Sequence, residues 1–174
     1  MKFKLDQAIE VLSRTPAVLR SMLSGLSGPW VFNNYGDNTF SPFDVVGHLI
    51  QGERTDWIQR TLIILEHGED RTFPPFDRYA MHKDSRGKTL DDLLSTFESL
   101  RERNLRELKA MHLTDQKLAL RGTHPSLGPV TLEALLAMWA THDLNHIHQI
   151  AKCMALQYRD AVGPWRPHVS VFRD

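Results

Sequence analysis

Four helix-length amphipathic stretches, separated by loops rich in Pro, Gly, Asn and Asp, constrain this chain more than any other feature. They cover residues 5–26, 41–68, 89–109 and 131–156, and in each of them apolar residues recur at helical spacing. No stretch of more than a few residues alternates apolar and polar residues between hairpin signals. The sequence therefore predicts an all-α fold, most simply a four-helix bundle.

Local signals mark where three of these helices begin. Ser41 lies three residues before Asp44, with a proline at the first helical position between them, which is the pattern of a capping box. Thr89 and Asp92 form a second pair of this kind. Thr131 is placed to cap the last helix. These caps predict helix starts at residues 42, 90 and 132.

Two breaks in the pattern limit the topology. Pro16 lies inside the first stretch and should kink that helix or start a new one near Thr15. Residues 69–88 form a long polar connection that contains Pro74 and Pro75, and connections of this length tend to be functional or mobile. Because it joins the second and third helices, we expect a long crossover connection rather than a plain up-and-down bundle.

Two histidines, His142 and His146, lie four residues apart in the last helical stretch. Positions four apart share one helix face, so both imidazoles can reach one metal ion such as zinc, nickel or iron(II). Two ligands rarely hold a catalytic metal alone. His48, about two turns into the second stretch, is either a hydrogen-bonded core residue or a third ligand. As a ligand it would complete a three-histidine site with open positions for water or substrate.

The neighbouring residues exclude some chemistry. The zincin motif needs glutamate after its first histidine, and Asp143 stands there instead, as an acceptor for an imidazole N–H or as a solvent-facing carboxylate. His124 either borders a pocket or packs within its loop, and His148 is expected at the surface. Cys153 lies seven residues, roughly 10 Å, beyond His146 along the helix, so we expect a small buried residue rather than a ligand.

Composition excludes other classes of function. Lysine plus arginine equals aspartate plus glutamate at 21 each, so no net charge points to nucleic acid or an anionic membrane as a partner. The charged face of the third helix, residues 101–109, is expected to be solvated.

One cysteine, no signal-peptide pattern and no apolar run near the ~20 residues of a membrane span predict a cytoplasmic protein. We expect a single domain over residues 1–174.

The chain resembles the DinB-like superfamily (DinB/YfiT-like proteins). Three segments carry the resemblance, and their order and spacing are more specific than any one of them: SPFDVVGHL at 41–49, HPSLGPVTL at 124–132 and THDLNHIHQI at 141–150. The resemblance implies a four-helix bundle, often dimeric, whose metal ligands fall on His48, His142 and His146. It implies a divalent ion, zinc or nickel first, with iron or manganese as further candidates.

Function is less closely implied than the fold. Relatives include thiol transferases that use small-molecule thiols, so the leading hypothesis is a metal-dependent S-transferase that joins a low-molecular-weight thiol to a small electrophile. The alternatives are a metal-dependent hydrolase and a non-catalytic metal-binding or sensing module. Histidines that serve only as core residues are a further alternative. The sequence assigns no catalytic residue; candidates to surround the metal ligands are Gln51, Glu53, Asp143 and Asn145.

Overall fold

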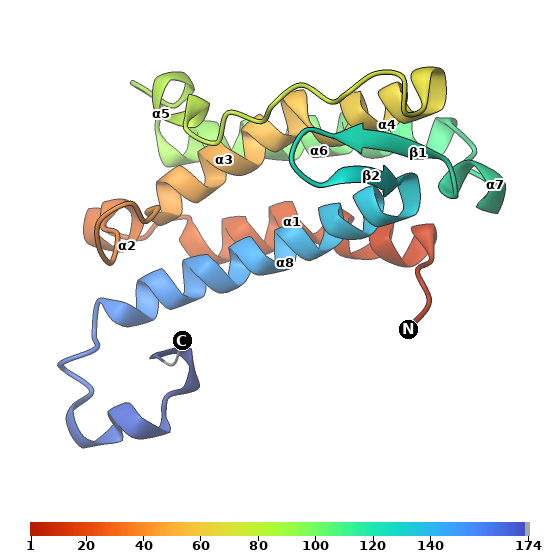
Figure 1. Ribbon diagram of the computed structural model, residues 1–174. Helices are drawn as coiled ribbons and strands as arrows, with labels where there is room; N and C mark the ends of the chain where they lie inside the picture. The colour runs from red at the N-terminus through yellow and green to blue at the C-terminus, as the bar shows by residue number, and fades with distance from the viewer. Residues whose placement is uncertain (173–174) are drawn as a thin grey trace.

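A computed structural model describes residues 1–172 and contains the four predicted bundle helices (Figure 1). Residues 173–174, the end of the predicted tail, lie outside the described residues. The helices are α1 (Leu5–Leu23), α3 (Pro42–Thr55) continued by α4 (Trp57–His67), α6 (Leu90–Ala110) and α8 (Leu132–Leu156). The mainly helical four-helix-bundle prediction is thereby confirmed.

The course of the chain confirms the crossover between the second and third helices. In Figure 1, α3, α4 and α6 run in one direction, whereas α1 and α8 run in the opposite direction. The connection from 68 to 89 therefore has to return along the bundle, and it contains the short α5 (Ala80–Asp84). Further short elements are α2 (Gly28–Phe32), α7 (Asp115–Leu118), η1 (Gly163–His168) and η2 (Ser170–Phe172).

All three predicted caps form. The Ser41 Oγ accepts a hydrogen bond from the Asp44 N–H at 3.2 Å, and the Ser41 N–H donates back to the Asp44 carboxylate at 3.0 Å. Thr89 and Asp92 make the same reciprocal pair at 3.1 and 2.8 Å. The Thr131 hydroxyl accepts from the third N–H of α8. Each cap satisfies backbone donors that would otherwise have no partner at the helix start.

Pro16 does not divide the first helix: α1 continues through it as one element and ends at Leu23 rather than near residue 26. Proline has no N–H, so it cannot bond the carbonyl of Leu12 four residues earlier. That carbonyl instead accepts a hydrogen bond from Arg101 Nη1 at 2.7 Å. A partner from another helix thus compensates for the missing helical bond.

The second predicted helix, in contrast, is two helices. It breaks at Asp56, whose φ of −113° and ψ of −81° are not helical. At this break the Trp57 indole packs close against Gly52, with its Nε1 only 3.1 Å from where a Cβ would stand. A larger residue at position 52 would crowd the indole. The break places Asp56 and Trp57 inside the protein, where both are buried.

A small antiparallel hairpin, β1 (Arg121–His124) with β2 (Gly128–Thr131), precedes α8 and is an addition to the all-helical prediction. Its strands have four residues each, which is too short for a visible alternation. The Phe73 N–H donates to the Thr123 carbonyl at 2.9 Å, so the long connection is tied to the hairpin. A Cβ on Gly122 would lie within 3.0 Å of Ile64 and Phe73, so only glycine allows this close packing.

The apolar core consists of two clusters, one toward each end of the bundle. The first contains residues such as Leu12, Trp57 and Trp139, and the second contains Leu19 and Ile150.

Within residues 1–172, none of the helices is long and apolar enough to cross a membrane.

Candidate metal centre

The structure brings His48, from α3, together with His142 and His146, from α8. The Nε2 atom of His142 lies 3.0 Å from that of His146 and 3.3 Å from that of His48. The potential ligand atoms of these three side chains all lie within 4.8 Å of one another. The predicted i, i+4 pair therefore does meet a third histidine, one that lies 94 residues away in sequence from His142.

The geometry fits a metal ion. An ion bound at roughly 2.0–2.1 Å to each nitrogen would separate the nitrogens by roughly 2.9–3.4 Å, and the observed spacings fall in that range. His146 Nδ1 lies 2.8 Å from the Gln149 side-chain oxygen, which can only accept, so Nδ1 carries the proton and Nε2 presents a lone pair. Without an ion, the three Nε2 atoms lie close together with too few N–H protons for each of them to take part in a good hydrogen bond.

Burial keeps these imidazoles uncharged. Burial, and then the neighbouring His146, lowers the pKa of His48 to about 4 and that of His142 to about 3. Burial also lowers the pKa of His146. Neutral imidazole is the form that binds metal, so the group is ready to bind at neutral pH.

Aromatic side chains pack edge-on against His48 and His142. The Trp57 ring meets His142 edge-on at 5.1 Å between centroids, and the Phe76 ring meets His48 edge-on at 5.3 Å. Phe76 belongs to the long connection between α4 and α6, so that connection contributes directly to the surroundings of the histidines. That this connection is functional or mobile stays a prediction.

His48 and His142 lie in the wall of a cavity of about 440 Å³. Apolar and aromatic side chains form most of its lining: Trp57, Phe73, Phe76, Leu127, Val130, Ala134, Leu135 and Met138. Its other polar members are Asp56, Arg60 and His124. A wider hollow of about 730 Å³ beside the N-terminal segment contains none of the three histidines. The smaller cavity is therefore the one next to the candidate metal centre.

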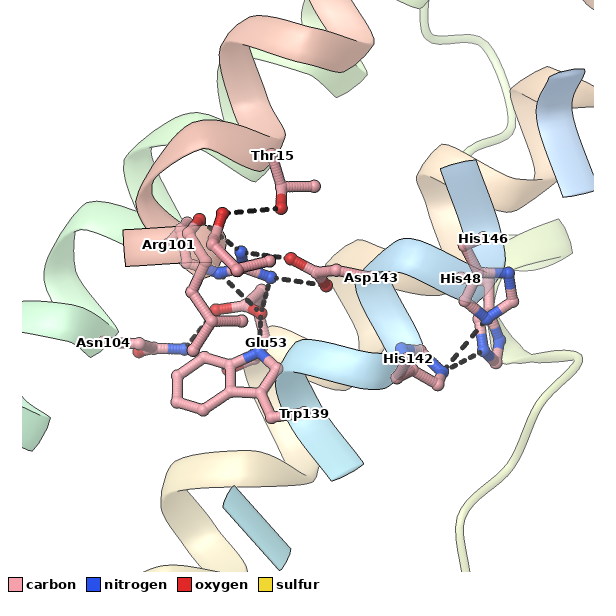
Figure 2. A network of polar contacts seen from close by, with 11 residues as sticks. Thr15, His48, Glu53, Arg101, Asn104, Trp139, His142, Asp143 and His146 are labelled. Atoms are coloured by element: carbon pink, nitrogen blue, oxygen red, sulfur yellow. Dashed lines mark hydrogen bonds and ion pairs between the residues drawn. The ribbon is translucent and has the colours of Figure 1, made fainter. Parts of the chain in front are cut away.

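A buried polar layer lies beside the histidines (Figure 2). At its centre, all five N–H groups of Arg101 have acceptors. Nε and Nη2 donate to Glu53 Oε1 at 3.1 and 2.8 Å, Nη1 and Nη2 donate to the Asp143 carboxylate at 2.6 and 3.0 Å, and Nη1 also donates to the Leu12 carbonyl. These contacts join α1, α3, α6 and α8.

Two further residues complete the layer around Glu53. Asn104 Nδ2 donates to the backbone carbonyl of Glu53 at 2.7 Å and to its carboxylate at 2.9 Å. The Trp139 indole N–H donates to the same carboxylate at 3.0 Å. Burial raises the pKa of Glu53, while Arg101 opposes that rise. Each carboxylate oxygen in the layer is thus held by donors from other helices.

The prediction of a solvated charged face on the third helix is therefore wrong for Arg101 and Asn104, which are 1% and 2% exposed. A signal was available: Arg101 stands four residues from both Phe97 and Leu105, on the apolar stripe of the helix. A charged residue on such a stripe is buried when a partner of opposite charge faces it. That partner comes from other helices, so the stripe alone could not reveal it.

Asp143 takes neither of the roles considered from the sequence. It is fully buried, so it is not solvent-facing, and its carboxylate accepts from Arg101 rather than from an imidazole. On α8 it follows His142 directly, and the helical turn of about 100° per residue directs it away from the histidines toward Arg101 (Figure 2). Glu53 likewise belongs to the polar layer.

The other candidate neighbours have different outcomes. Asn145 is exposed and Gln51 is half-buried, and within residues 1–172 neither makes a hydrogen bond to the three histidines. Gln149 does contact His146, and this contact was not predicted from the sequence. Its position three residues after His146, on the same helix face, was the available signal.

The remaining predictions for this region can be compared directly. His124 lines the cavity, and its Nδ1 also accepts from the backbone N–H of Ser126 at 3.2 Å, so it has both of the roles considered for it. His148 is exposed, as predicted. Cys153 is buried, as predicted, and its thiol donates to the Asn33 carbonyl at 3.2 Å.

Acid should destabilise the metal-free protein through these histidines. Their folded pKa values lie below the ordinary value of 6.5, so the unfolded chain binds more protons as the pH falls below 6.5, and the free energy of unfolding falls with it. For His142 alone the expected loss is roughly 2–3 kcal/mol between pH 6.5 and 4.5. Urea denaturation in the presence of a chelator measures it.

The matched comparison is His142→Gln, which cannot take up the proton. Wild type should lose more stability than this variant over the same pH range. Asp56 acts in the opposite direction, because burial raises its pKa to about 6 and its contribution grows as the pH falls. Asp56 is present in both proteins, so its contribution cancels when their pH profiles are compared. Identical pH profiles would contradict the assigned burial of a neutral imidazole.

Comparisons with known proteins agree with this fold. A solved structure of YfiT from Bacillus subtilis, described as "a probable metal-dependent hydrolase with an unusual four-helix bundle topology", superposes with a TM-score of 0.75. The two sequences are 26% identical, and the match covers 92% of this chain and 90% of YfiT. Among curated proteins, none matches significantly. The family model described as the DinB superfamily matches residues 12–150, and the chain therefore belongs to the DinB superfamily.

Proposed function

We propose that this protein is a metal-dependent hydrolase that acts on a small molecule bound in the cavity beside His48 and His142. One observation carries the proposal: three neutral imidazoles converge, and two of them, His48 and His142, lie in the wall of a largely apolar cavity of about 440 Å³. Cavities of this size and lining are typical of small-molecule sites. The description of YfiT as a hydrolase supports this reaction class over the S-transfer reaction expected first from the sequence.

We assign His48, His142 and His146 as the metal ligands. Imidazole nitrogens suit zinc, nickel, copper and iron, so zinc or nickel is proposed as the native ion, with iron as a further candidate. Within residues 1–172, the group contains no carboxylate as a fourth ligand. A three-ligand site keeps positions open for water and substrate, as catalytic sites do and closed structural sites do not.

The chain's own residues prepare the site for chemistry. When bound, the ion would supply Lewis acidity for activating water and polarising an electrophile. His48 and His142 stay unprotonated at neutral pH and so keep their lone pairs available. Trp57 and Phe76 pack on these imidazoles and limit access of bulk water. Gln149 fixes the tautomer of His146 through its Nδ1.

A panel of substrates tests the proposal. Purified protein loaded with zinc or nickel is incubated with small esters, amides and lactones, with and without several low-molecular-weight thiols. We expect hydrolysis that needs the metal but no thiol, that is lost in His142→Ala and that is retained in His148→Ala, the matched change at an exposed histidine of the same helix. Product analysis by mass spectrometry separates hydrolysis from thiol addition.

The same panel identifies the alternatives. Conjugation that depends on thiol would favour the S-transferase predicted from the family resemblance. A protein that binds metal at the three histidines but turns over nothing in the panel would favour a metal-binding or sensing module. The homodimer implied by the resemblance stays a prediction, and size measurement in solution tests it.

A further inference from the structure

The cavity next to the histidines contains a buried ion pair that the proposed function does not use. Arg60 Nε lies 2.5 Å from Asp56 Oδ1, and the two side chains are only 8% and 11% exposed. Both residues line the cavity. Asp56 is the residue at the break between α3 and α4, and Arg60 stands one turn into α4. An ion pair buried in the wall of a substrate-sized cavity needs an explanation, because taking these charges out of water is costly.

The Arg60 guanidinium is only partly used by the protein. Asp56 faces its Nε, and the Phe73 ring covers its face at 5.3 Å from Cζ. Within residues 1–172, Arg60 Nε and Asp56 Oδ1 are buried and form an ion pair without hydrogen-bond geometry. In this described part of the chain, Nη1 and Nη2 donate to no protein group, and neither is among the fully buried polar atoms that lack a partner. Arg101, in contrast, has acceptors for all five N–H groups. Arg60 therefore retains an unused pair of donors in the cavity wall.

The charges of this wall disfavour an anion with two charges. Asp56 balances Arg60, and the remaining titratable groups of the cavity are His48, His142 and His124. Burial, and then the charge of Arg60, lowers the pKa of His124, so it adds no second cation. A dianion such as a phosphate monoester would face Asp56 with only one guanidinium to compensate, whereas a carboxylate matches the two donors of one guanidinium edge.

We propose that Arg60, oriented by Asp56 and Phe73, binds a carboxylate group of the substrate. The substrate class is then a small molecule with an apolar body, which the lining side chains accept, and one carboxylate. That the bound molecule is a substrate rests on the proposed function. The binding site itself can be tested without turnover.

The competing explanation is that the ion pair only fastens the junction of α3 and α4. The two explanations differ for Asp56→Asn. A fastening role predicts that Asp56→Asn and Arg60→Met do the same damage, because each breaks the pair. An anion site predicts opposite effects, because Asp56→Asn removes a competing carboxylate and leaves the guanidinium in place.

Calorimetric titration with hexanoate and with its neutral counterpart hexanamide distinguishes them. The full-length chain is used in metal-free and zinc-loaded form, so that binding of hexanoate to the ion is separated from binding to Arg60. We expect metal-free wild type to prefer hexanoate by at least about tenfold, since a charge-assisted pair is lost with the amide. Arg60→Met should abolish this preference, Arg60→Lys should keep part of it, and Asp56→Asn should keep or increase it.

Several results would overturn the proposal: no hexanoate binding to wild type, equal binding of the two probes, an unchanged preference in Arg60→Met, or loss of the preference in Asp56→Asn as well. Thermal unfolding of each variant shows whether it is folded. If hexanoate binds through Arg60 but no substrate in the panel is hydrolysed, the hydrolase proposal fails and the anion site stands. If the panel shows hydrolysis but no preference for carboxylates, the hydrolase proposal stands and the anion site fails.

Discussion

Replacing His48, His142 or His146 with alanine should reduce the bound metal from about one ion per chain to almost none after dialysis. Each nitrogen would be one of three direct ligands, and even partners outside the ligand shell change metal affinity by about 10–100-fold. Removing a ligand should therefore weaken binding by at least about a hundredfold. Elemental analysis of protein purified without chelators, followed by calorimetric titration with zinc, measures both quantities.

His148→Ala is the matched control, because His148 lies on the same helix but is exposed. It should bind metal as wild type does. Equal metal content in wild type and in all three ligand variants would show that the ion, if any, binds elsewhere. Circular dichroism of the metal-free proteins separates loss of a ligand from loss of the fold.

Replacing Arg101 with methionine should cost about 3–5 kcal/mol of folding free energy, which is a large part of the 5–15 kcal/mol typical of a domain. The change leaves Glu53 and Asp143 buried without their cation and the Leu12 carbonyl without a donor. Urea denaturation of the metal-free protein at pH 7 measures the loss. Because Asp143 adjoins His142, zinc affinity of the folded variant should fall as well.

Arg106→Met on the same helix is the control. Arg106 is 72% exposed and lies 3.9 Å from Glu102, so its loss should cost less than about 1 kcal/mol. A triple variant with Glu53→Met, Arg101→Met and Asp143→Leu should recover much of the stability lost in Arg101→Met, because it leaves no unpaired charge. Arg101→Met as stable as Arg106→Met would contradict the central role of the polar layer.

Predictions based on local spacing agree with the structure. The capping pairs at Ser41 and Thr89 and the helical stripes depend on residues within one or two turns of each other, so the sequence displays them directly. The pair His142 and His146 belongs to the same class, since a helix brings residues four apart onto one face. The crossover also followed from the length of the connection between the second and third helices.

Features that depend on distant partners did not follow from the sequence. Arg101 had the appearance of a solvated charge because its acceptors lie on α1, α3 and α8. Pro16 had the appearance of a helix break because the donor that replaces its missing N–H comes from α6. The hairpin was missed because its strands are short and are held by the long connection.

The amino-acid sequence by itself determined the helices, their caps and two of the three converging histidines, because these depend on the periodicity of one helix at a time. Only the tertiary structure decided that His48 meets them, that Arg101 joins four helices beneath them and that Arg60 faces a cavity beside them. The physical reason is that burial turns a charge or an imidazole from a solvated group into one that must be paired. Which partner is available depends on contacts between residues far apart in the chain.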